Sequence, residues 1–328
     1  MAAGPPTVFH LPPDAPLHDT GWGHPEHQGR LRALASTVGR SLLTLHGRVE
    51  QRDARPATEE ELLRAHTRDH VERVRRAVAR SREEGLVRLD PDTVVSPASW
   101  GAATGSAGAV VAAAEAVAAG SARAAFVASR PPGHHATADR AMGFCLFNHV
   151  AVAARHLRAR GLAERVLIVD WDVHHGNGTQ DIFYEDGTVF YLSLHQSPHY
   201  PGTGALHERG SGPGLGATLN LPLRAGTPRA TWLEVFDDAL AKVVDGFAPD
   251  FVLISSGFDA MAGDPLGGML LEPEDFHRMT RRVMDLMAGH AGGRVVALLE
   301  GGYDPARTGD GAVAVIQALA GMGMHDPA

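Results

Sequence analysis

Four apolar runs each end in polar residues and glycine, and they cover residues 124–128, 166–169, 251–254 and 294–299. Runs of this length, bounded by turn-forming residues, predict buried β-strands. Segments with helical periodicity lie between the runs. They cover residues 148–160, 232–247 and 274–288. Strands that alternate with helices predict an α/β fold built on a parallel sheet.

Two of the runs are followed by residues that can bind a metal ion. Asp172 and His174 follow the second run and are two residues apart, so in extended backbone their side chains point to the same side. Asp259 follows the third run and is the candidate third ligand. Three protein ligands with an open fourth position are typical of a catalytic zinc site. Taken alone, each Asp also suits a helix cap.

The other two runs end in residues suited to proton transfer. His134 and His135 follow a Pro-Pro-Gly turn, and buried imidazoles need partners, so the pair favours general acid–base catalysis over packing. Tyr303 follows Gly301 and Gly302, where backbone can approach a ligand closely and the Tyr hydroxyl can donate to a developing oxyanion. Ligand sites of open α/β sheets form at the carboxyl ends of strands, where all four motifs are expected.

A charged stretch in the first third of the chain predicts a long helix. Thr58 and Glu61 have the spacing of a capping box, and the stretch from Glu61 to Glu84 is expected to form one helix. His66 and His70 lie four residues apart within it, a spacing that can bind metal, although packing or surface roles are commoner for such a pair.

Composition narrows the class of protein. The chain has 328 residues, 44% of them hydrophobic, and no linker-like segment divides it, so we expect a single domain over residues 1–328. The formal net charge is −8 without a basic block, which argues against direct nucleic-acid binding. The single cysteine, Cys145, excludes an intrachain disulfide and is expected to be buried.

The compartment is expected to be the cytoplasm. The N-terminus lacks the charged and apolar regions of a signal peptide. The Ala-rich stretch 102–119 is interrupted by Glu115 and several glycines, so it predicts a helix packed closely against a neighbour and no membrane span.

Six motifs in this order resemble the zinc-dependent histone deacetylase family, and within it the class II branch and the bacterial amidohydrolases. They are RPPGHH, GFCLFNH, DWDVHHGNGTQ, SLHQSPHYPGTG, SSGFDAMAGDPLGG and LEGGYD. The resemblance extends from about Leu17 to Tyr303. It implies the arginase/deacetylase α/β fold, in which helices cover both faces of a central eight-stranded parallel sheet. It also implies hydrolysis of acylated amines by water that a zinc ion activates.

The resemblance implies a role for each residue of the site. Zn²⁺ is expected on the three ligands named above, although Fe²⁺ and Co²⁺ also suit them. His135 is the expected general base and then acid, His134 stabilises the oxyanion, and Tyr303 donates to the oxyanion from the other side. Asp170 is the expected partner of His134, and Asn177 that of His135. Class I members carry Asp at the position of Asn177, so Asn177 favours class II.

Substrate and cation sites are implied in the same way. The residues expected to contact the acyl-lysine substrate are Phe144, Tyr200, Leu266, Gly301 and Asp92. One or two structural K⁺ ions are also implied. The first K⁺ site is expected at Asp170, Asp172, His174, Ser193 and Leu194, and the second at Phe183, Asp186 and Val189.

The expected substrate is an Nε-acetyl-lysine or Nε-acyl-lysine in a peptide or protein, and an acetylpolyamine amidohydrolase is the nearest alternative. Polyamine-selective class II members carry Glu where this chain has Leu266, which argues against that route. A bacterial polyamine type with acids elsewhere on the rim stays open. An inactive binding module would have lost a ligand, a His or the Tyr, and an arginase-like site needs more Asp ligands. The oligomeric state is left open, with a homo-oligomer as one option.

Overall fold

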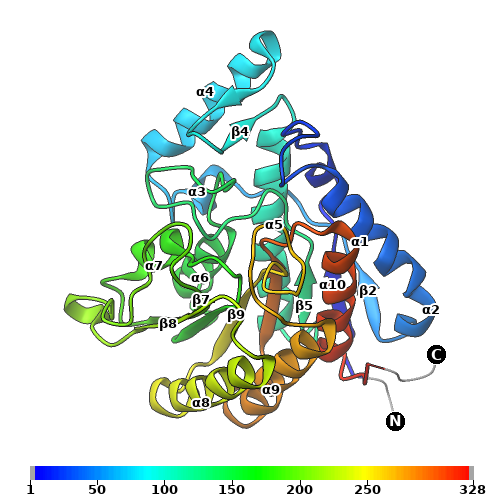
Figure 1. Ribbon diagram of the computed structural model, residues 1–328, viewed down its shortest axis with the longest axis vertical. Coiled ribbons are helices and arrows are strands. Elements are labelled where there is room, and N and C mark those ends of the chain that lie inside the picture. Colours follow the sequence, from blue (N-terminus) through cyan, green and yellow to red (C-terminus); the bar gives the residue numbers. More distant parts are fainter. Residues whose placement is uncertain (1–3, 325–328) are drawn as a thin grey trace.

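The computed structural model describes residues 4–324, and its centre is an eight-stranded sheet in the order β2-β1-β5-β10-β9-β6-β7-β8 (Figure 1). Every neighbouring pair in this sheet is parallel. The strands are β1 Thr7–His10, β2 Val49–Gln51, β5 Ala125–Val127, β6 Val166–Asp170, β7 Val189–Gln196, β8 Thr218–Leu223, β9 Phe251–Ser256 and β10 Val295–Leu299. The eight-stranded parallel sheet expected from the sequence is confirmed.

Helices cover both faces of this sheet (Figure 1). They are α1 Gly29–Arg40, α2 Leu42–Leu45, α3 Glu59–Leu62, α4 Arg68–Glu84, α5 Ser99–Ala118, α6 His149–Ala159, α7 Asn177–Phe183, α8 Arg229–Phe247, α9 Pro273–Ala291 and α10 Pro305–Leu319. Short 3₁₀ helices span Ala15–Leu17 and Gly212–Gly214, and β3 Val87–Arg88 pairs antiparallel with β4 Val94–Val95.

The strands are apolar on both sides because each side faces its own core. On one side, Val169 and Ile254 belong to the core formed with α1, α8, α9 and α10. On the other side, their neighbours Ile168 and Leu253 belong to the core formed with α4, α5 and α6. Successive side chains of a strand point to opposite faces, so a sheet covered on both sides needs continuous apolar runs.

Helix α5 lies inside the second core. It is the one described helix long and apolar enough to cross a membrane, but 72% of the relevant window is buried inside the protein. A Cβ at Gly108 would lie 2.0 Å from the carbonyl oxygen of Arg55, so only glycine permits this approach. The composition of α5 therefore reflects close packing, as the sequence predicts.

The prediction of one helix from Glu61 to Glu84 is wrong. The capping box at Thr58 and Glu61 forms as expected, but α3 ends at Leu62 and α4 starts at Arg68. His66 sits in the intervening turn, where its two ring nitrogens bond the carbonyl of Thr137 and the amide of Asn148. These long-range bonds break the helix, and the His66 ring is a packing residue and no metal ligand.

The topology brings the four motifs to one edge. Strands β5, β10, β9 and β6 are consecutive neighbours in the middle of the sheet. In register, Asp170 of β6 lies beside Ser255 of β9, and Leu299 of β10 lies beside Ser256. Because the strands are parallel, their carboxyl ends and the loops that follow meet at the same place.

Candidate active site

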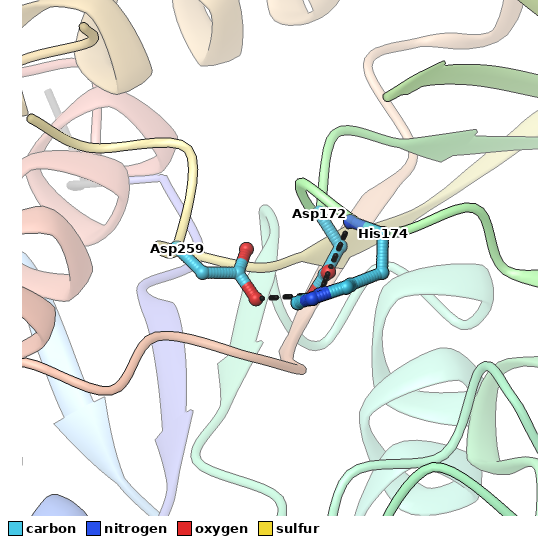
Figure 2. Close-up of side chains that lie close together, drawn as sticks. All are labelled: Asp172, His174 and Asp259. Atoms are coloured by element: carbon cyan, nitrogen blue, oxygen red, sulfur yellow. Dashed lines mark hydrogen bonds and ion pairs between the residues drawn. The ribbon is translucent and has the colours of Figure 1, made fainter. Parts of the chain in front are cut away.

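Asp172, His174 and Asp259 converge beyond the ends of β6 and β9 (Figure 2). We call them the carboxylate cluster. All three are buried, and one ligand atom from each lies within 4.8 Å of the others. His174 Nδ1 is 3.0 Å from Asp172 Oδ1 and 3.2 Å from Asp259 Oδ2. The residues that the sequence proposes as metal ligands are therefore close enough to share one ion.

The charges of the carboxylate cluster favour a cation. Burial and the Asp172 carboxylate raise the pKa of Asp259 to about 7. Burial alone lowers the pKa of His174, but the two carboxylates raise it to about 10. A Cβ at Gly301 would lie 2.0 Å from Asp259 Oδ2, and the Gly301 amide donates to Asp172 Oδ2 at 2.8 Å. Two carboxylates and one imidazole, held in place by backbone, fit a divalent metal ion.

His134 lies against acidic groups. Its Nδ1 donates to Asp170 Oδ2 at 3.0 Å, and its Nε2 is 3.8 Å from Asp172 Oδ1. Burial alone would lower the pKa of His134, but Asp172 and Asp170 raise it well above the ordinary value. The two carboxylates therefore favour the imidazolium form of His134, whose ring lies beside Asp172 of the carboxylate cluster.

His135 has the opposite environment. Its Nδ1 lies 2.8 Å from Asn177 Oδ1, and an amide oxygen only accepts, so Nδ1 carries the proton and Nε2 is free to accept one. Burial lowers the pKa of His135 well below the ordinary value, and His134 and His174 lower it further. The two imidazoles lie 4.1 Å apart between ring centres, yet they hold different protonation states.

Tyr303 lies in the loop between β10 and α10, directly after Gly301 and Gly302. Its amide donates to Asp264 Oδ2 at 2.6 Å, and the Arg30 guanidinium lies over its ring at 4.8 Å. Burial raises the pKa of Tyr303 well above the ordinary value, so the hydroxyl is a hydrogen-bond donor. The arrangement suits donation to an oxyanion.

His135, Tyr303 and His174 of the carboxylate cluster line one cavity of 490 Å³, a size typical of small-molecule sites. The lining residues are Asp92, His135, Gly143, Phe144, His174, Gln196, His199, Tyr200, Pro265, Leu266, Gly267, Gly268 and Tyr303. Four of the five residues expected to contact substrate are among them. Gly301 is the fifth, and it lies behind the carboxylate cluster instead.

Phe144 forms part of the wall in a strained backbone conformation. Its φ is 68°, which is uncommon for a residue with a Cβ. The Phe144 amide donates to Thr93 Oγ1 at 3.0 Å, and its ring packs edge-on against His24 and Tyr303. Such strain is concentrated at ligand sites, where the surrounding structure fixes it.

Gln196 and His199 also line the cavity, and the sequence indicated no role for either. His199 stacks on the ring of His174 with centres 4.8 Å apart, and its Nε2 bonds the carbonyl of Leu266 at 2.8 Å. Gln196 accepts from the Gly268 amide at 2.8 Å. Gln196 ends β7 and His199 lies in the loop after it. The sequence could not place them in the cavity, because their position depends on the packing of that loop against residues 265–268.

Of the residues expected at the first K⁺ site, Asp170 ends β6 and Ser193 and Leu194 lie within β7, whereas those of the second lie between the end of α7 and the start of β7. Asp170 and Ser193 are register partners, and Ser193 Oγ bonds His195 Nδ1 at 2.9 Å. At the second expected site, the Asp186 carboxylate pairs with Arg155 and accepts from the Thr188 amide at 2.8 Å.

A second buried ionic group, the arginine cluster, consists of Glu26, Arg30 and Arg130. Arg130 Nε and Arg30 Nη1 both donate to Glu26 Oε1, at 2.7 and 2.8 Å. The remaining N–H groups of the two arginines donate to carbonyl oxygens, among them those of Gly302 and Glu300. The arginine cluster thus supports the loop that carries Tyr303.

Comparison with known proteins agrees with this geometry. The family profile for the histone deacetylase domain matches residues 24–319. The chain is 40% identical over 306 residues to a histone deacetylase-like amidohydrolase of Pseudomonas aeruginosa, covering 92% of this chain and 78% of that protein. It is 37% identical over 286 residues to a probable deacetylase of Archaeoglobus fulgidus, covering 87% and 78%. The chain belongs to the histone deacetylase family.

A solved structure shows the same fold. The crystal structure of the HDA15 HD domain superposes with a TM-score of 0.91 at 38% identity, covering 99% of this chain and 91% of that one. Histone deacetylase 15 of Arabidopsis thaliana is 41% identical over 302 residues, which is 91% of this chain and 53% of that protein. The family, the fold and these relatives make this chain a hydrolytic deacetylase of acylated amines, with a buried cluster able to bind a metal ion.

Proposed function

We propose that this chain is a zinc-dependent deacylase of Nε-acyl-lysine in peptides or proteins. The observation that carries the proposal is the cavity in which His174 of the carboxylate cluster, His135 and Tyr303 meet an aromatic wall. Phe144 and Tyr200 suit a long apolar stem that ends in a neutral amide. Leu266 places no charge on the rim, so the cavity offers nothing there for a distal ammonium of a polyamine.

The two imidazoles divide the proton chemistry. His135 is neutral, so its Nε2 takes a proton from the attacking water and then delivers it to the leaving amine. The His134 imidazolium and the Tyr303 hydroxyl stabilise the charge that develops on the carbonyl oxygen. When bound, a divalent ion polarises the amide carbonyl and lowers the pKa of water. Asp172, His174 and Asp259 would hold that ion.

Further parts of the proposal rest on the same residues. Asn177, as the neutral partner of His135, supports the assignment of the enzyme to class II. Structural K⁺ is proposed at the first cation site, which includes Ser193 and Leu194, and less directly at the second, which includes Phe183 and Val189. We also propose one domain, a cytoplasmic location, and no direct contact with nucleic acid or membrane. Asp92 on the rim is proposed to accept hydrogen bonds from a substrate backbone.

Hydrolysis of two matched substrates tests the proposal. The zinc-loaded protein is given an acetyl-lysine peptide and an N-acetylated polyamine, with His135→Ala as the inactive control. Faster hydrolysis of the peptide, with no activity in the His135→Ala control, supports the lysine deacylase. Faster hydrolysis of the polyamine would make the alternative, an acetylpolyamine amidohydrolase, correct. Leu266→Glu is expected to shift the preference toward the polyamine, because it adds a carboxylate at the rim.

A further inference from the structure

Glu300 directly follows β10, is fully buried, and is neither a residue that lines the cavity nor a member of the carboxylate cluster. Its Oε2 accepts from the Gly133 amide at 2.6 Å and from the His134 amide at 3.1 Å. Its Oε1 accepts from Ser255 Oγ at 3.0 Å. One side chain therefore joins the turn after β5 to strands β9 and β10.

Two consecutive backbone amides aimed at one oxygen form a concave site for an acceptor. A carboxyl is costly to bury, and among the described residues no Arg or Lys side chain pairs with that of Glu300. Arg30 bonds the Glu300 carbonyl oxygen, at 2.7 Å, and leaves the carboxyl alone. The two amides of the turn and the Ser255 hydroxyl thus hold the carboxyl in place, and the carboxyl fixes the turn relative to Ser255.

The turn is fixed from both sides. On its carbonyl side, the amide of Thr179 donates to the His134 oxygen at 3.1 Å, and the amide of Ala136 donates to the Gly133 oxygen at 3.0 Å. On its amide side, Glu300 is the acceptor. Without it, two buried N–H groups would have no partner, which is unfavourable and leaves the turn free to move.

We infer that Glu300 is a positioning residue, whose buried carboxyl fixes the backbone that carries His134 and His135. The inference rests on the proposed function, because it explains how the two imidazoles are held for that reaction. A displacement of about 1 Å at a catalytic group can lower the rate about 100-fold. Glu300 therefore acts on the rate of the chemical step through the histidines, without touching substrate.

Glu300→Ala and Glu300→Gln separate positioning from simple stability. Glu300→Ala is expected to lower kcat about 10- to 100-fold with KM changed less than about threefold, as for residues that orient a catalytic group. Glu300→Gln keeps an acceptor oxygen for the two amides, and burial raises the pKa of the Glu300 carboxyl to about 7, so a neutral amide is a close substitute. It is expected to restore most of kcat. Equal losses in the two variants would overturn the inference.

A matched control is available elsewhere in the chain. Glu61 is also a buried carboxyl that accepts a backbone amide, that of Thr58 at 2.8 Å, but it belongs to α3 and contacts no residue of the site. Glu61→Ala should lower the melting temperature and leave kcat per folded molecule unchanged. If Glu300→Ala behaves in the same way, its role is stability alone and the inference is wrong.

Hydrogen exchange gives a readout that needs no turnover. Amide exchange in the segment 130–136 is expected to accelerate in Glu300→Ala and to a smaller extent in Ser255→Ala, which removes only the third bond. Unchanged exchange there would overturn the inference whatever the substrate is. The two proposals can also fail separately. If the wild-type protein hydrolyses no acylated amine but exchange still accelerates in the variants, the proposed function is wrong, whereas the role of Glu300 in holding the turn stands. Ser255→Ala serves as the test if Glu300→Ala does not fold.

Discussion

The arginine cluster and the carboxylate cluster lie at the same edge of the sheet and are equally buried, but they are completed in different ways. In the arginine cluster, Glu26 receives hydrogen bonds from both guanidinium groups, and the remaining donors reach carbonyl oxygens. In the carboxylate cluster, two carboxylates face one imidazole, and burial together with repulsion from Asp172 raises the pKa of Asp259. The charged groups of the arginine cluster find their partners within the chain, except that Glu26 Oε2 has no hydrogen bond, whereas the carboxylate cluster is arranged for an added cation.

The difference shows which buried charges are structural and which are functional. A buried charge that finds its partners inside the chain stabilises one packing of the loops around it. A buried charge without a sufficient partner is unfavourable until a ligand supplies one, and such groups mark functional sites. Stability and activity should therefore respond in opposite directions to substitutions in the two clusters.

The largest effect is expected from Asp259→Asn. Loss of one ligand should remove the metal ion, and activity should fall by at least the ~10²–10³-fold known for losing one transition-state contact. Because the folded-state pKa of Asp259 is raised, its ionised form opposes folding above the unfolded pKa of about 4. The metal-free variant should therefore be more stable than metal-free wild type at pH 7, by about 1–3 kcal/mol. Metal analysis checks the loss of the ion, and denaturant unfolding of the two metal-free proteins checks the gain in stability. A variant less stable than metal-free wild type would contradict the prediction.

Glu26→Gln should act in the opposite sense. It leaves Arg30 and Arg130 without their carboxylate, and breaking a buried pair costs about 3–5 kcal/mol. Metal content should stay at the wild-type ratio, because the carboxylate cluster is untouched. Thermal unfolding with and without zinc measures this: zinc should still raise the melting temperature of Glu26→Gln but not that of Asp259→Asn.

Acid should weaken the parts of the fold that hold buried neutral imidazoles. Burial lowers the pKa of His18 to about 4, of His66 to about 3 and of His149 to about 4. The unfolded chain binds these protons near pH 6.5, so stability falls as pH drops from 6.5 toward 4, by about 1.4 kcal/mol per pH unit for each group. Urea unfolding across this window checks the slope, and a flat profile would show that the rings are already solvated or charged.

The smallest effect is expected from Asn177→Asp. A carboxylate beside Nδ1 favours the imidazolium form of His135, so the acidic limb of the kcat/KM profile should move to higher pH by about one unit. The reason is that the base must be neutral to accept the water proton. An unmoved profile would mean that Asn177 is not the partner of His135 in the working enzyme.

Local sequence patterns predict much of the fold and of the candidate site. The apolar runs predict the central strands, the strand-end residues predict the carboxylate cluster and the His pair, and the ordered motifs indicate the family. The Glu61–Glu84 prediction was wrong because propensity could not show that His66 would bond Thr137 and Asn148 and end α3 early. Local propensity is a weak guide where long-range bonds compete.

The residue types and their order along the chain determined the fold class, the four strand-end motifs and the chemistry they can perform, because strand periodicity and ligand chemistry are local properties. Only the tertiary structure decided which buried charged groups find partners within the chain. It gave Glu26 one arginine from α1 and one from the turn after β5, left two carboxylates facing one imidazole, and placed Glu300 under the turn of the His pair. Apart from the close pairs Glu26–Arg30 and Asp172–His174, these contacts join residues 85 to 167 positions apart. The parallel sheet brings these residues to one edge, and no local pattern encodes such contacts.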